Sequence, residues 1–138
     1  MITIHSAAKN TSHLDGEGYV LAWDSALGSR PYAAGHGDQV HKVNWKKDSI
    51  YVPPNAYFHQ HLNTGPGPAK HIAVYGERLP LGFRPVITDD GPQNMRPQSE
   101  GGTLIEYEDE DPRVRADFEA ILRSNGIECK MPPVTYRN

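Results

Sequence analysis

The chain has 138 residues and a mass of 15.3 kDa, which fits a single domain over residues 1–138. Its 14 basic residues stand against 17 acidic ones, and the net charge of -3 excludes the basic face of a dedicated nucleic-acid binder. No apolar run approaches the roughly 18 residues of a membrane span, and the first residues lack the pattern of a secretory signal. The single cysteine, Cys129, excludes an internal disulfide framework. We therefore expect a cytoplasmic protein that binds neither nucleic acid nor membrane.

Short apolar runs separated by turn-forming residues fill most of the chain. Thirteen Gly and 12 Pro lie between these runs, a pattern typical of a β-sandwich or a β-barrel. The predicted strands are 2–7, 19–23, 39–45, 49–52, 56–62 and 70–75, all within a barrel region 1–76, with a weak strand at 85–88 and a last one at 103–107. We expect 70–75 to form a hairpin with 56–62. Residues 77–102 are predicted to be rich in loops.

One helix is predicted near the C-terminus, over residues 111–124. Asp111 is a good N-cap, and Pro112 suits the first helical position. The apolar positions recur at the spacing of one helical face: Val114, Phe118, Ile121 and Leu122. The acidic run 106–111 is interpreted as a solvated lead-in that is favourable beside the positive end of the helix, with a cation or partner site as the alternative.

Two histidines two residues apart mark the segment with the clearest chemistry, 48–63. Side chains alternate along a strand, so Tyr57, His59 and His61 point to one face, while Phe58, Gln60 and Leu62 point to the other. Two imidazoles on one face can reach one first-row metal ion. The alternative is a pair of ordinary hydrogen-bonded histidines. Tyr57 is the candidate catalytic group, because it shares the face of the two histidines.

The same segment resembles the second conserved motif of the cupin superfamily, which contains Pro-x-Gly-x-x-His-x-x-x-Asn. Pro54, His59 and Asn63 match this motif in type and spacing, and Ala56 replaces the glycine. The longer string Val-Pro-Pro-Asn-x-x-Phe-His-Gln-His-x-Asn-Thr-Gly looks like a bacterial and fungal cupin subgroup whose function is unassigned or dioxygenase-like. The resemblance implies an all-β fold, a small antiparallel jelly-roll β-barrel with one C-terminal α-helix. It also implies that His59 is a metal ligand.

The first cupin motif is degenerate in this chain. With Gly16 as its closing glycine, the position of the metal-binding glutamate falls on Lys9, and His5 alone remains of the two histidine positions. An ammonium group beside a cation costs free energy. If residues 2–13 form one strand, His13 could replace a missing ligand. The candidate metal ligands are therefore His59 and His61, joined by His5 or His13, around a divalent transition metal such as Fe, Mn, Ni or Zn.

The other candidate residues have plainer interpretations. His71 is predicted to pack or to form hydrogen bonds, and Asn63 to hold the turn that follows its strand. Tyr51, Tyr57 and Trp45 either line a pocket or pack in the core. Cys129 is interpreted as a bystander.

Two functions remain open. The first is a metal-dependent enzyme that acts on a small organic substrate by dioxygenase-like, lyase or isomerase chemistry. The second is a non-catalytic binding module, or a partial cupin domain completed by a partner subunit. If the first strands of the barrel are missing, the exposed sheet edges would have to pair with another chain, and a homodimer would provide that pairing.

Overall fold

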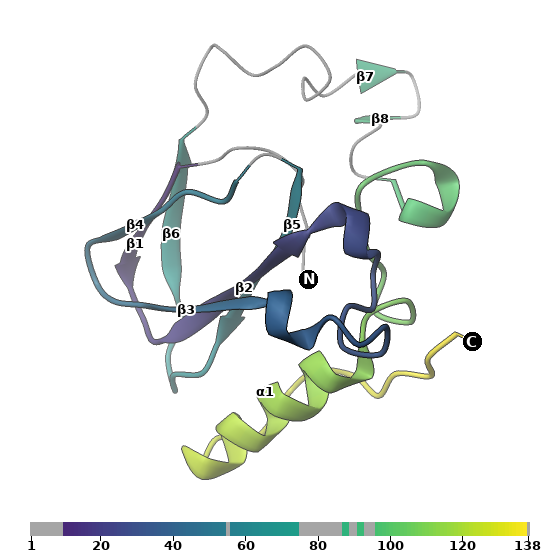
Figure 1. The fold of residues 1–138 in the computed structure, drawn as a ribbon. Helices are drawn as coiled ribbons and strands as arrows, with labels where there is room; N and C mark the ends of the chain where they lie inside the picture. Colours follow the sequence, from purple (N-terminus) through teal and green to yellow (C-terminus); the bar gives the residue numbers. More distant parts are fainter. Residues whose placement is uncertain (1–9, 55, 75–86, 89–90, 93–95, 138) are drawn as a thin grey trace.

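The computed structural model describes residues 10–54, 56–74, 87–88, 91–92 and 96–137. Two antiparallel sheets of three strands each form the frame of the fold (Figure 1). In the first, which we name the far sheet, β1 (Asn10–Asp15) lies between β4 (Ser49–Tyr51) and β6 (Lys70–Val74). In the second, the helix-side sheet, β2 (Gly18–Asp24) lies between β3 (His41–Trp45) and β5 (Tyr57–Asn63).

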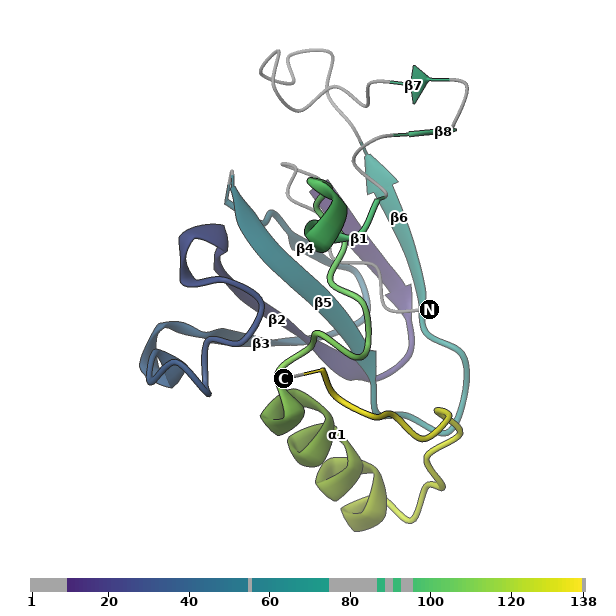
Figure 2. The same cartoon turned by 90° about the vertical axis from the view of Figure 1, so that its right-hand side faces the viewer.

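The remaining elements are short, apart from one helix. They are β7 (Ile87–Thr88), β8 (Gly91–Pro92), the 3-10 turns Ser25–Leu27, Gly37–Gln39 and Gln98–Glu100, and the helix α1 (Pro112–Ser124). Figure 2 shows α1 below the helix-side sheet, on the side away from β1 and β6. The described residues thus form a strand-rich fold with antiparallel sheets and one α-helix, and their two sheets are not joined into a closed barrel.

Local patterning predicted most of these elements. The expected strands at 19–23, 39–45, 49–52, 56–62 and 70–75 correspond to β2, β3, β4, β5 and β6, and the weak strand at 85–88 overlaps β7. The strand expected at 2–7 lies outside the described residues. Asp111 caps α1 as predicted, with its carboxylate accepting a hydrogen bond from the Arg113 amide at 3.0 Å.

The predicted hairpin between 56–62 and 70–75 is wrong. All seven residues of β5 pair with β2, whereas β6 pairs with β1 in the other sheet. The connecting segment 64–69 is too long for a tight turn and carries Pro66 and Pro68, which have no N–H to donate to a ladder. It therefore crosses from one sheet to the other.

The strand predicted at 103–107 is also wrong. Only Leu104 forms a bridge, and it is a parallel one with Pro97. The chain then turns, with the Asp109 amide donating to the Glu106 carbonyl at 3.0 Å, while the Ile105 side chain is buried in the core. The apolar run at 103–107 therefore reflects the burial of Ile105 in the core and not pairing with a neighbouring strand.

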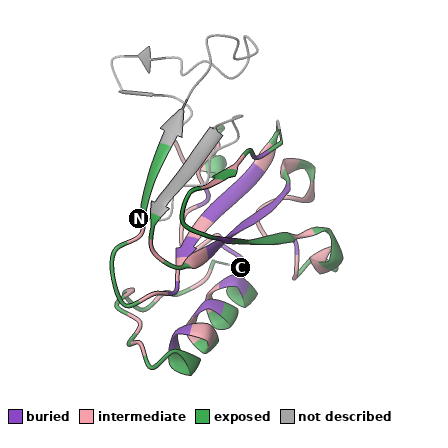
Figure 3. Ribbon diagram, turned by 90° about the vertical axis from the view of Figure 1, so that its left-hand side faces the viewer, coloured by how far each residue is buried: buried purple, intermediate pink, exposed green. Residues whose placement is uncertain are grey.

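The main apolar core lies between the helix-side sheet and α1, not between the two sheets. Figure 3 shows the buried stripe along this sheet and along the facing side of the helix. The cluster consists of Tyr19, Leu21, Trp23, Phe58, Leu62, Ile105, Val114, Phe118 and Leu122. Three of the four predicted apolar positions of α1 belong to it, and Ile121 packs against its margin. The other face of the helix-side sheet carries His59 and His61 beside the buried Val20 and Ala22.

Replacing Ala56 by glycine is expected to stabilise the fold. Ala56 has a φ of 61°, in the left-handed region. A side chain there costs about 1–2 kcal/mol, so Ala56→Gly should raise the free energy of unfolding by about 1 kcal/mol in urea titrations. Ala116→Gly, in an exposed interior turn of α1, is the matched control and should lower it by about 1 kcal/mol. A loss of stability in both variants would contradict the strain at Ala56.

Candidate functional site

The two predicted histidines lie side by side on the inner face of the helix-side sheet. His59 pairs with Ala22 and His61 with Val20 on the central strand β2. His59 is buried and His61 is half-buried, and their ring centroids are 5.6 Å apart in an edge-to-face arrangement. The Nδ1 atoms of both rings are buried. The small side chain of Ala22 leaves space on this face for imidazoles.

A third histidine joins this pair from the opposite sheet. His71, on β6, stacks on His61 with ring centroids 5.0 Å apart and an interplanar angle of 8°. Trp45, at the end of β3, lies 6.0 Å from the His61 ring on another side. The prediction that His71 packs against its surroundings is confirmed. The sequence did not show that its packing partner is one of the two site histidines.

The other predicted residues lie at different distances from this cluster. Tyr57 begins β5, is half-buried and stacks on His41 with ring centroids 6.4 Å apart. His13 lies in β1, opposite His71 in the ladder. His5 lies outside the described residues, as does Lys9. Asn63 holds the turn as predicted, because its side chain donates to the Gly67 carbonyl at 2.8 Å.

No group of three or more His, Cys, Asp or Glu in the described part of the chain is arranged to hold an ion. His59 and His61 place two imidazoles side by side, and the His71 ring stacks nearly parallel on that of His61. An ion held by two imidazoles needs one nitrogen of each ring about 2.0–2.1 Å away.

A buried polar contact lies directly behind the two histidines. Gln60 is fully buried on the opposite face of β5, and its Nε2 donates to Glu110 Oε1 at 2.6 Å. Glu110 is only 4% exposed. Burial raises its pKa from 4.5 to about 7, although the hydrogen bond from Gln60 and the charge of Arg115 act in the opposite direction. The neighbouring charge of Asp111 adds to the increase.

The interpretation of 106–111 as a solvated lead-in is therefore wrong for its last two residues. Asp111 is buried as well, and it accepts hydrogen bonds from the backbone amides of Arg113 and Ala33 at 3.0 and 2.9 Å. Alternation along β5 predicted that Gln60 faces away from the histidines. Its partner lies 50 residues away in the chain, and no local signal indicated it.

Glu110→Gln should change how stability depends on pH. Folding raises the pKa of Glu110, so the native state holds a proton that the unfolded state releases between pH 4.5 and about 7. Stability from this group is complete below pH 4.5 and is lost as the pH rises through 7. The variant should therefore match the wild type at pH 4.5 and exceed it by about 1–3 kcal/mol at pH 8.

Urea unfolding of both proteins from pH 4.5 to 8 measures the difference between their free energies of unfolding. The histidines are the same in both proteins, so their titration cancels in this difference. A difference that does not depend on pH would contradict a protonated Glu110 in the folded protein.

Comparisons with protein-family models, curated proteins and solved structures found no match. In the part of the chain that the structure describes, no helix has both the length and the apolar character needed to cross a membrane.

Proposed function

We propose that this protein is a cupin-like domain of the jelly-roll type that holds a divalent transition metal through His59 and His61 and acts on a small organic molecule. The observation that carries the proposal is the pair of inward-facing imidazoles of His59 and His61, 5.6 Å apart, with the imidazole of His71 stacked on His61 from the other sheet. The positive φ of Ala56, at the position where the cupin motif has glycine, agrees with the same assignment.

Neutral imidazoles are ligands that Fe, Mn, Ni and Zn accept, so His59 and His61 have the chemistry of two ligands, and His71 lies beside them, stacked on His61. A metal bound here would supply a Lewis acid that polarises an oxygen atom of the substrate. Tyr57 lies on the same strand face as His59 and presents a hydroxyl group for hydrogen bonding to that substrate. Dioxygenase-like, lyase and isomerase chemistry are all compatible with these groups.

Elemental analysis of the untagged protein tests the metal. We expect close to one ion of Fe, Mn, Ni or Zn per chain. The double variant His59→Ala, His61→Ala should retain less than about a tenth of it, because both ligands are removed. His36→Ala is the matched control, since His36 precedes the 3-10 turn Gly37–Gln39 and contacts Gln39. No metal in the wild type, even after reconstitution with each ion in turn, would refute the proposal.

The second candidate is a domain completed by a second copy of the chain. Three large apolar side chains of the far sheet are exposed. They are Ile50 on β4 at 72%, Val52 just after β4 at 54% and Ile72 on β6 at 50%. Ile50 and Ile72 flank Ser12 in the ladder of the far sheet. Sedimentation should show a homodimer that the Ile50→Asp, Ile72→Asp variant dissociates, whereas a monomeric wild type would exclude this candidate.

A further inference from the structure

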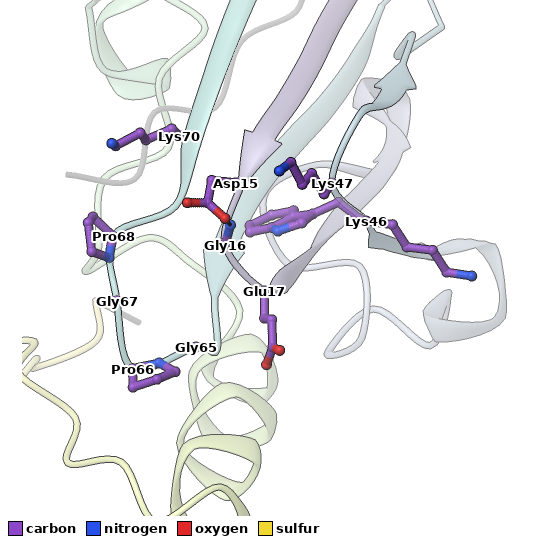
Figure 4. Close-up of a pocket in the computed structure, with 11 residues that line it drawn as sticks. Asp15, Gly16, Glu17, Lys46, Lys47, Gly65, Pro66, Gly67, Pro68 and Lys70 are labelled. Carbon is purple, nitrogen blue, oxygen red and sulfur yellow. Dashed lines mark hydrogen bonds between the residues drawn. The ribbon is translucent and has the colours of Figure 1, made fainter.

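A large cavity lies at one end of the two sheets, beside Trp45 (Figure 4). Its walls come from the turn between β1 and β2, the residues after β3 and the Gly65–Pro68 loop that leads to β6. Its volume is about 650 Å³, within the range of small-molecule sites. We name it the lysine cavity, after Lys46, Lys47 and Lys70 in its lining.

The charge of the lysine cavity favours an anion. Its lining has three lysines and two carboxylates, those of Asp15 and Glu17, which leaves one positive charge in excess. The ion pairs between described residues involve arginines elsewhere, and none includes these lysines. One oxygen of Asp15 already accepts a hydrogen bond from the Gly16 amide at 2.9 Å. Figure 4 shows Asp15 between Lys47 and Lys70, with the ammonium end of Lys47 directed toward Asp15, whereas the ends of Lys70, Lys46 and Glu17 point away from it.

Trp45 connects the cavity with the histidine cluster. Its side chain lines the cavity, and its ring lies 6.0 Å from that of His61. The indole crosses directly over Gly18, where a Cβ atom would overlap the ring. The ring is therefore fixed in place, and a molecule in the cavity would be separated from His61 by one indole.

We propose that the lysine cavity binds a small organic carboxylic acid. Lys47 and Lys70 hold its carboxylate through charge-assisted hydrogen bonds, and the apolar body of the acid lies against Trp45. Asp15 accepts a hydrogen bond from a hydroxyl or protonated group of the same ligand. This inference goes beyond the proposed function, because the site needs neither a metal nor a reaction.

3-Hydroxybenzoate, with one carboxylate and one hydroxyl group on a planar ring, is the probe. Titration of the chelator-treated protein at low salt, followed by NMR, should show saturable binding that shifts the indole N–H signal of Trp45. The signal of Trp23, whose Nε1 donates to the Gly28 carbonyl at 2.9 Å in the core, should stay in place and serves as an internal reference.

The variant Lys47→Gln, Lys70→Gln should bind 3-hydroxybenzoate at least about tenfold more weakly, because two charge-assisted hydrogen bonds are lost. Lys42→Gln is the matched control, since Lys42 lies over the Tyr19 ring at 4.1 Å and does not line the cavity. It should change the affinity less than about twofold. The single variant His59→Ala, which keeps the His61 ring beside Trp45, should bind 3-hydroxybenzoate like the wild type, so loss of the metal and loss of acid binding are separate outcomes.

Three results would overturn the proposal. They are an absence of saturable binding, binding that leaves the Trp45 signal unmoved, and equal losses of affinity in the cavity variant and the Lys42 control.

Discussion

Replacing Phe118 by alanine should lower the free energy of unfolding by about 3–5 kcal/mol. Phe118 is a buried member of the core cluster that joins α1 to the helix-side sheet. Its truncation leaves a cavity that the flanking strands cannot fill, because their backbones are fixed by ladders on both sides of β2. Urea unfolding followed by circular dichroism measures the change.

Ile121→Ala is the matched control on the same helix. Ile121 packs only against the margin of the cluster, so its truncation should cost less than half as much. Equal losses of stability in the two variants would contradict packing of α1 on the sheet through Val114, Phe118 and Leu122.

Replacing Gly18 by alanine should destabilise the fold by a similar amount. A Cβ atom there would overlap both the carbonyl oxygen of Leu62 and the ring of Trp45. The carbonyl belongs to the β5 backbone, so the strand itself has to move. Gly18→Ala should therefore lower the free energy of unfolding by about 3 kcal/mol and shift the indole N–H signal of Trp45.

Gly67→Ala is the control for this substitution. A Cβ atom at Gly67 meets nothing within 4 Å, and its φ is not positive. Its replacement should change stability by less than about 0.5 kcal/mol. An unchanged Trp45 signal in Gly18→Ala would contradict the close contact between the ring and β2.

Elements defined by neighbouring residues could be predicted from the sequence. The helix was predicted at both ends because Asp111 caps it and Asn125 lies beyond its last turn. The placement of His59 and His61 on one face followed from alternation, which depends only on the pleat of one strand. The turn at Asn63 followed from the hydrogen-bonding capacity of its own side chain.

Pairings between distant residues could not be predicted. The hairpin error arose because two adjacent strands usually pair, whereas β5 found its full seven-residue register with β2. The acidic run looked solvated because nothing within it indicates the buried Gln60 amide that meets Glu110. Thr103–Tyr107 has the composition of a strand but no partner beyond one bridge.

The sequence by itself determined the position of the helix, the positions of five of the six strands in the two sheets and which side chains of each of those strands share a face, because these properties depend on residues a few positions apart. The tertiary structure decided that His71 meets His61, that Trp45 stands between the histidines and the lysine cavity, and that Glu110 is buried behind them. Those contacts depend on which strands pair and on how the core closes over α1, and this is a property of the whole chain.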